Sequence, residues 1–182
     1  MIKTKNVKII RQSLGGHADN VFDVVIGLLP DGINKIVDLG CGSFRWIKKG
    51  YTIVLVDINN KYEDVIIHDL NKDFPFKDKE FDGVVAIEVI EHLWNPKHFL
   101  KECFRIAKKW IIVTTPDINK EFVVNQWFGR NAVKYGHKIM CPIETFNSAC
   151  KENNWKIETV KQSRVSIVVK MIPLELALMR KN

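Results

Sequence analysis

Two carboxylates and an imidazole stand close together in the segment Glu88-Val-Ile-Glu91-His92. If this segment is helical, residues three and four apart share one face, which would then present all three side chains. Such a face could hold a divalent ion, with His137 as a more distant fourth ligand. Carboxylate oxygens together with one or two imidazoles suit Mg²⁺, Mn²⁺ or Zn²⁺.

The same residues also allow an interpretation without metal, because paired acids and a histidine are common at helix starts. Glu88 would then line a ligand pocket, Glu91 would cap the next helix and His92 would orient the loop. In that case His92 or His137 is the best candidate for a general base, since the unperturbed pKa of imidazole lies near neutrality.

A candidate ligand loop begins at Val37-Asp-Leu-Gly40-Cys-Gly42, where an apolar segment runs directly into two glycines. Gly40 and Gly42 permit a tight turn and the close approach of a ligand that a side chain would obstruct. The dinucleotide fingerprint Gly-x-Gly-x-x-Gly is incomplete, because Arg45 stands at its third glycine position. The pattern therefore disfavours a nicotinamide or flavin cofactor.

Two aspartates follow where the next predicted strands end. Asp57 closes a strand 17 residues after Gly40, where an acid can accept hydrogen bonds from ribose hydroxyls. Asp69 comes shortly after a third strand and suits an exocyclic amine such as that of adenine. Either aspartate alone would be an ordinary turn or cap residue. Their order behind the glycine pair, each at the carboxyl end of a strand, predicts a nucleoside site.

Apolar segments of strand length surround these residues. Four of them, 36–39, 52–57, 65–67 and 81–87, are continuous rather than alternating, which is typical of parallel strands buried on both faces. A fifth strand is predicted at 110–115. The alternating segments 155–160 and 165–170 have a short connection and predict an antiparallel pair.

The spacing of apolar residues predicts helices at about 17–29 and 96–107, and a third helix is expected at about 142–153. This order of elements predicts a three-layer α/β domain whose mostly parallel sheet ends in an antiparallel hairpin. A ligand would then bind outside the carboxyl ends of the early strands.

The composition fits a folded domain. The chain has 182 residues, of which 46% are hydrophobic and 27% charged. No apolar run approaches the length of about 20 residues that spans a bilayer, and the basic N-terminus leads into no apolar stretch, so we expect a cytoplasmic protein without membrane insertion. The net charge of +7 comes from scattered residues, which favours a solvated surface over a nucleic-acid tail. Four cysteines without a CxxC pair exclude a zinc ribbon and a thioredoxin-type motif.

Taken together, these motifs resemble the class I S-adenosylmethionine-dependent methyltransferases over residues from about 35 to 162. The resemblance is carried by Val37-Asp-Leu-Gly-Cys-Gly42, Val56-Asp57-Ile58, His68-Asp69-Leu70, Phe81-Asp-Gly-Val-Val-Ala-Ile87, Glu88-Val-Ile-Glu-His-Leu93 and Val113-Thr-Thr-Pro-Asp117. It implies a Rossmann-like fold and S-adenosylmethionine as the cofactor. We expect one domain over residues 1–182, with an N-terminal helical segment at about 1–32 and the cofactor-binding sheet and acceptor region at about 35–172.

The resemblance also implies roles for single residues. Asp38 and the glycine loop would meet the methionine portion of the cofactor, Asp57 the ribose and Asp69 the adenine. The expected cofactor contacts are Asp38, Gly40, Cys41, Gly42, Asp57, Ile58, Asp69, Leu70 and Glu88. Phe44 stands where many members carry a third glycine, and the short connections after the first two strands imply trimmed or missing helices and an open site.

Two subfamilies carry a comparable Glu-x-x-Glu-His element: ubiquinone-pathway O-methyltransferases with related small-molecule enzymes, and small-RNA 3′-terminal 2′-O-methyltransferases, in which it binds metal. The RNA enzymes complete that site with a later His-rich element, where this chain has only His137. His137 and the following Cys141-Pro-Ile-Glu-Thr-Phe146 resemble the small-molecule pattern. A small-molecule acceptor, with O-methylation ahead of N- or C-methylation, is therefore favoured. The alternatives are a metal-dependent RNA methyltransferase and a noncatalytic cofactor-binding or partner-binding domain.

Aromatic residues near the predicted insertions favour core and lid packing over direct stacking on a substrate. They are Trp94, Phe122, Trp127, Phe128 and Tyr135. If the stretch 117–135 is a lid, it would exclude water and select the acceptor.

Overall fold

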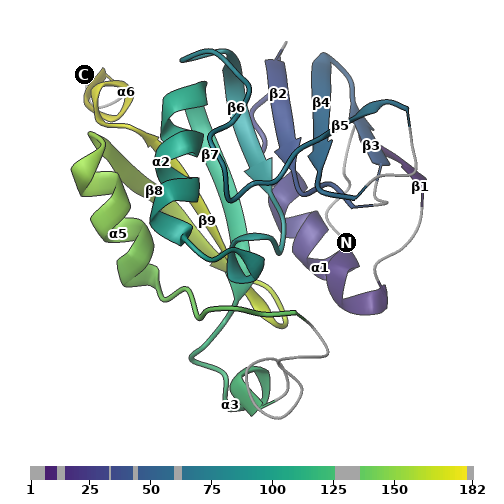
Figure 1. Ribbon diagram of the computed structural model, residues 1–182, viewed down its shortest axis with the longest axis vertical. Helices are drawn as coiled ribbons and strands as arrows, with labels where there is room; N and C mark the ends of the chain where they lie inside the picture. The colour runs from purple at the N-terminus through teal and green to yellow at the C-terminus, as the bar shows by residue number, and fades with distance from the viewer. Residues whose placement is uncertain are drawn as a thin grey trace.

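A seven-stranded sheet forms the centre of the computed structural model, in the order β5-β4-β2-β6-β7-β9-β8 (Figure 1). The structure describes residues 7–11, 15–32, 34–42, 45–59, 63–125 and 136–179. The strands are β2 (Asn34–Leu39), β4 (Tyr51–Asp57), β5 (Val65–Ile67), β6 (Phe81–Ala86), β7 (Ala107–Pro116), β8 (Trp155–Gln162) and β9 (Ser166–Pro173). The first five are parallel, and β9 then pairs antiparallel with both β7 and β8. The predicted mostly parallel sheet with a final hairpin is confirmed.

Helices cover both faces of the sheet, which gives the three predicted layers (Figure 1). Helices α2 (Pro96–Ile106) and α5 (Ile143–Glu152) pack on one face, and α1 (Gly15–Ile26) and the short α6 (Leu174–Met179) contribute to the core on the other. Two shorter turns, η1 (Ile90–His92) and α3 (Glu121–Val123), follow the carboxyl ends of β6 and β7.

After β2 the chain forms a strand, whereas a regular alternation of strands and helices would have a helix at this point. This strand is part of a separate two-stranded ribbon. It pairs β3 (Arg45–Lys48) antiparallel with β1 (Val7–Arg11). The expected N-terminal helical segment at about 1–32 is thus helical only in part, because β1 belongs to this ribbon. The buried ring of Trp46 in β3 makes edge contacts with Phe22 of α1 and Tyr51 of β4, so the ribbon is fastened to the α1 side of the sheet.

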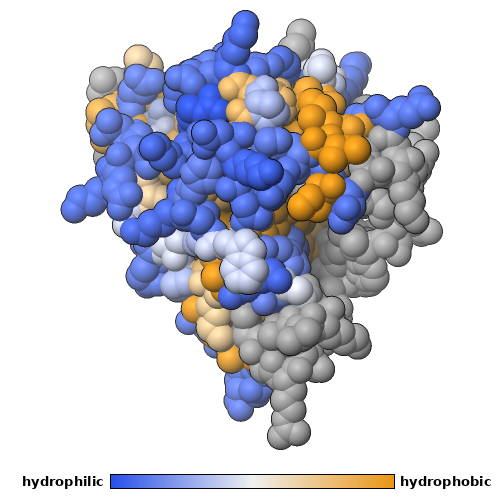
Figure 2. Space-filling model, viewed as in Figure 1, coloured by the Kyte–Doolittle hydropathy of each residue, from blue (hydrophilic) through white to orange (hydrophobic). Residues whose placement is uncertain are grey.

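The β5 edge of the sheet is apolar and exposed. Ile66 and Ile67 are 40% and 68% exposed, and Figure 2 shows apolar atoms gathered over this region. Among the residues described between β4 and β5, none is helical. This agrees with the trimmed connection expected from the sequence. In the described part of the chain no helix is long and apolar enough to span a bilayer.

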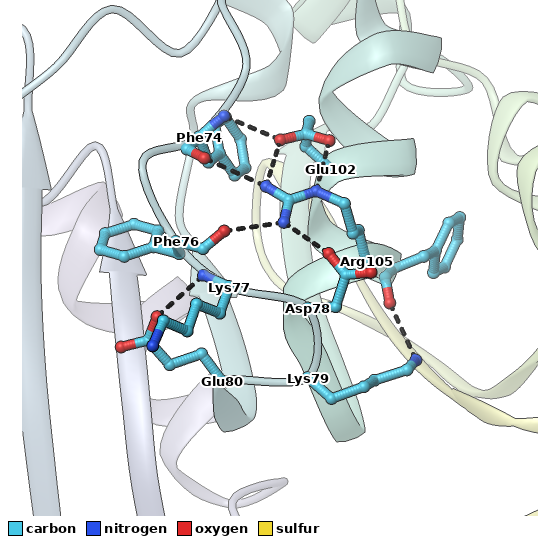
Figure 3. A network of polar contacts seen from close by, with 9 residues as sticks. Phe74, Phe76, Lys77, Asp78, Lys79, Glu80, Glu102 and Arg105 are labelled. Atoms are coloured by element: carbon cyan, nitrogen blue, oxygen red, sulfur yellow. Dashed lines mark hydrogen bonds and ion pairs between the residues drawn. The ribbon is translucent and has the colours of Figure 1, made fainter.

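A guanidinium fork holds the long connection between β5 and β6 (Figure 3). Arg105 of α2 donates hydrogen bonds to the Phe74 and Phe76 carbonyls and to the carboxylates of Asp78 and Glu102. The buried Glu102 also accepts from the Phe74 N–H group. The Arg105 hydrogen bonds hold the pKa of Glu102 below its ordinary value. The connection that follows Asp69 is therefore tied to α2.

We expect Arg105→Met to lower the free energy of unfolding by about 2–4 kcal/mol, because it leaves the buried Glu102 carboxylate without its partner and strands two carbonyls. Urea unfolding followed by circular dichroism measures this loss. Lys101→Met, an exposed change on the same helix, is the matched control. Equal stabilities of the two variants would remove Arg105 from this role.

Candidate functional site

A cavity of about 290 Å³ lies at the carboxyl ends of β2, β4, β5 and β6. Its lining residues are Gly40, Asp57, Ile58, Asp69, Leu70, Asn71, Glu88, Val89, His92 and Leu93. Six of the nine residues expected to contact the cofactor are thus brought to one cavity from segments far apart in the sequence. The parallel register is the cause, because it places the ends of successive strands at the same edge of the sheet.

The glycine loop turns sharply at the end of β2. The N–H groups of Gly40 and Cys41 both donate to the Val56 carbonyl of β4, at 2.8 and 3.0 Å. Gly40 has φ +73°, and a Cβ atom there would stand 2.4 Å from a methyl carbon of Val89. A side chain at this position would therefore clash with the segment that follows β6.

Asp57 ties this loop to the end of β4. One carboxylate oxygen accepts from the Gly42 N–H group at 2.8 Å, and the other accepts from the Asn59 N–H group at 3.0 Å. A carboxylate has about four lone-pair sites, so each oxygen retains capacity for a ligand hydroxyl. Asp57 thus shapes the loop and faces the cavity at once.

Asp69 lines the same cavity from a turn that follows β5. Its Oδ1 atom accepts from both the backbone N–H and the side-chain amide of Asn71, and these bonds lower the pKa of Asp69. The Asn71 Oδ1 atom in turn accepts from the Trp94 N–H group at 2.9 Å. Asn71, which the sequence did not single out, therefore joins the Asp69 turn to the segment after η1.

The remaining residues of the glycine motif are buried. Asp38 is 3% exposed, and its Oδ2 atom accepts from the Trp46 indole N–H at 2.9 Å. Cys41 is 5% exposed and packs with Leu55 and Val65. The residues that line the cavity do not include Asp38, Cys41 or Gly42.

Glu88 departs from the expected helical face. Its φ of +53° places it in the left-handed region, before η1 begins at Ile90. Its carboxylate accepts from the Thr114 hydroxyl at 2.6 Å and the Ser166 hydroxyl at 3.0 Å, on β7 and β9. The prediction of one helix face with Glu88, Glu91 and His92 is therefore wrong, because Glu88 lies before η1 with a left-handed backbone and its carboxylate is bonded to β7 and β9.

Glu91, His92 and His137 do come together. One ligand atom from each lies within 4.8 Å of the others, and the two imidazole rings meet edge to face. Glu91 is fully buried, and neither of its carboxylate oxygens accepts a hydrogen bond from any residue that the structure describes. The Nδ1 atom of His92 lies 3.2 Å from the Gly136 carbonyl, which orients the ring.

Burial governs the protonation of this group. It raises the pKa of Glu91 well above its ordinary value, and the Glu88 carboxyl adds to that rise. Burial also lowers the pKa of His92. Both shifts favour the uncharged forms. Three potential ligand atoms held together with an orphaned buried carboxylate are the donor set that a divalent cation takes.

Sequence reasoning missed the residues that act across strands. Thr114 and Ser166 lie far from Glu88 in sequence, and nothing in their local pattern indicates the contact. Asn71 carried a signal, because an Asp-x-Asn turn after a strand favours side-chain to backbone hydrogen bonds.

Phe44, Trp127, Phe128 and Tyr135 lie outside the described residues, as does the stretch 117–135 beyond residue 125.

Comparison with known proteins places this geometry in a family. The sequence matches the methyltransferase domain family over residues 18–160, which is most of the chain. It is also 26% identical over 110 residues to a ubiquinone biosynthesis O-methyltransferase of Pseudomonas fluorescens, a match that covers 49% of this chain and 45% of the relative. The chain therefore matches less than half the length of that relative.

Two solved structures show the same fold. A SAM-dependent methyltransferase from Methanosarcina mazei has a TM-score of 0.60 at 15% identity, covering 82% of this chain and 97% of the other. The [4+2]-cyclase SpnF has a TM-score of 0.62 at 13% identity, covering 90% and 84%. The fold alone thus accommodates more than one chemistry.

The two glycines of the loop should respond differently to substitution. Gly40→Ala combines a left-handed backbone with a steric clash on Val89, whereas at Gly42, with φ +53°, an added Cβ meets no atom of the described residues within 4 Å. We expect Gly42→Ala to cost about 1–2 kcal/mol of unfolding free energy and Gly40→Ala to cost at least about 1 kcal/mol more. Urea unfolding of both variants measures the difference, and equal losses would contradict the Val89 clash.

Proposed function

The chain belongs to the methyltransferase domain family, and from that premise we propose that it transfers a methyl group from S-adenosylmethionine to a small-molecule acceptor, with oxygen as the favoured acceptor atom. One observation carries the proposal: Asp57, Asp69 and Glu88 line a single cavity at the carboxyl ends of parallel strands. The similarity to a ubiquinone biosynthesis O-methyltransferase supports the choice of a small molecule and of oxygen.

The cavity offers separate partners for the parts of a nucleoside. The carboxylate of Asp57 accepts hydrogen bonds from ribose hydroxyls, and the Asp69 carboxylate suits an exocyclic amine. Ile58 is 56% exposed and lines the cavity, so it offers apolar surface to a planar base. The loop 40–42 would adjoin the methionine portion, with Asp38 and Cys41 supporting it from the core.

S-Adenosylmethionine supplies an electrophilic methyl group that needs little covalent help. The protein's share of catalysis is then to hold the acceptor in line with the donor and to take up its proton. His92 lines the cavity, and burial holds the pKa of its ring below the ordinary value, so it is available in its neutral, proton-accepting form. His137 contacts the His92 ring and is the second candidate for this role.

A divalent cation is the alternative to a histidine base at this site, because an imidazole nitrogen that holds a metal ion is not free to take up a proton. Glu91, His92 and His137 would hold it, and the observation that favours it is the buried Glu91 carboxylate without a hydrogen-bond partner among the described residues. Such a cation polarises a bound oxygen and stabilises its negative charge. Glu88 is not part of this set, since its carboxylate is turned to Thr114 and Ser166. A cation here would also suit the alternative of an RNA acceptor.

We expect Asp57→Asn to weaken binding of S-adenosylhomocysteine, the demethylated product, by about 1–3 kcal/mol, because one ribose acceptor is lost and the Gly42 bond is weakened. Isothermal titration calorimetry measures the dissociation constant. Asp23→Asn on the exposed side of α1 is the matched control. Tight binding by the Asp57 variant would remove this residue from the site, and absence of binding by the unaltered protein would overturn the proposed function.

We expect Mn²⁺ or Zn²⁺ at about 100 times its dissociation constant to raise the unfolding midpoint of the metal-free protein by about 5–10 °C. Glu91→Gln removes a ligand charge and should abolish this shift, while Glu175→Gln on the exposed side of α6 should keep it. Differential scanning calorimetry in buffers with and without metal gives both results. The same shift in the Glu91 variant would exclude this residue as a ligand.

A further inference from the structure

A carboxylate without a cation partner lies in the wall of the cavity. Glu88 is one of the lining residues, and its carboxylate accepts hydrogen bonds from the hydroxyls of Thr114 and Ser166. Among the ion pairs of the described residues none includes Glu88. Burial raises the pKa of Glu88 and the two hydroxyls lower it, without a contribution from any described lysine or arginine. A carboxylate in such surroundings is stabilised by a cation that binds beside it.

Two strands fix the position of this carboxylate. Thr114 of β7 holds Glu88 twice, because its hydroxyl accepts from the Glu88 N–H group at 2.9 Å and donates to the Oε1 atom. Ser166 of β9 donates to the Oε2 atom. These two bonds occupy about half of the roughly four lone-pair sites of a carboxylate. The other lone pairs are left for a ligand in the cavity.

The acids of the cavity follow different strands of the sheet. The order β5-β4-β2-β6 places Asp69 after β5, Asp57 after β4 and Glu88 after β6. With the adenine at Asp69 and the ribose at Asp57, the substituent on the ribose continues toward the ends of β2 and β6. In S-adenosylmethionine that substituent begins with the sulfonium, which is bonded to the 5′ carbon of the ribose. Glu88 is therefore the acid of the cavity lining that lies on the sulfonium side of the nucleoside.

We propose that the Glu88 carboxylate recognises the positive charge of the sulfonium and thereby distinguishes the methyl donor from the demethylated product. This inference rests on the proposed function and gives Glu88 a specific role in it. Methyl transfer breaks the S–CH3 bond and leaves its electron pair on sulfur, while the methyl carbon bonds to the acceptor oxygen and the acceptor proton goes to the base. Sulfur is then a neutral thioether, so its attraction to Glu88 is lost. The carboxylate therefore favours binding of the donor and release of the product.

The ratio of two dissociation constants tests this role. Calorimetry measures the binding of S-adenosylmethionine and of S-adenosylhomocysteine, which differ only in the methyl group and the charge on sulfur. We expect Glu88→Gln to weaken binding of the donor about threefold to tenfold more than binding of the product, because the amide carries no charge. Asp57→Asn, at another acid of the same cavity, is the matched control. It should weaken both ligands alike, since both carry the ribose hydroxyls.

A third ligand, 5′-methylthioadenosine, separates the sulfonium from the amino group of the methionine portion, because it carries neither charge. A Glu88→Gln variant that binds donor and product equally weakly but binds 5′-methylthioadenosine normally would assign Glu88 to the amino group and overturn the inference. An unchanged ratio of donor to product binding would overturn it as well, and either result leaves the proposed function standing. Circular dichroism checks that the variant folds, and Glu88→Met, of similar length and without charge, takes its place if it does not. Failure of the unaltered protein to bind donor and product would instead remove the proposed function.

Discussion

The contact between Gly40 and Val89 sets the spacing of the whole site. These residues follow β2 and β6, the two central neighbours of the sheet, and Val89 occupies the space that a Cβ of Gly40 would fill. The glycine loop and the η1 turn can approach each other only because one of them lacks a side chain. The positions of Asp57 and His92 in the cavity lining depend on this approach, since Asp57 is bonded to the loop and His92 belongs to the turn.

A second constraint follows directly along the chain. Glu88 adopts a left-handed backbone that costs a non-glycine residue about 1 kcal/mol or more. The hydroxyl of Thr114 compensates by accepting from the Glu88 N–H group and donating to its carboxylate, and Ser166 binds the other carboxylate oxygen. The strained residue is thereby held from two neighbouring strands.

The sequence predicted the features that follow from local residue patterns and from the common edge at which parallel strands end. The strand ends at Asp57 and Asp69 could be placed because continuous apolar segments precede them, and parallel strands present their carboxyl ends together. The β1–β3 ribbon could not be foreseen, because its two short strands lie far apart in the chain and neither carries a strong pattern. The orientation of Glu88 was missed for a different reason. The helical spacing of Glu88, Glu91 and His92 assumes a regular helix, and Glu88 has a left-handed backbone instead.

The electrostatics of the cavity agree with the chemistry of a sulfonium donor. The donor is cationic, and its positive charge disappears as the methyl group moves, so fixed cations beside the reacting atoms would repel the bound donor. Among the described residues that line the cavity there is no lysine or arginine, while Asp57 and Asp69 supply acids and Val89 and Leu93 supply apolar walls. Lys138 stands outside this lining, and its positive charge adds to the effect of burial in lowering the pKa of the cavity-lining His92. A cation at this position favours the neutral, proton-accepting form of His92, which is the form that taking up the acceptor proton requires.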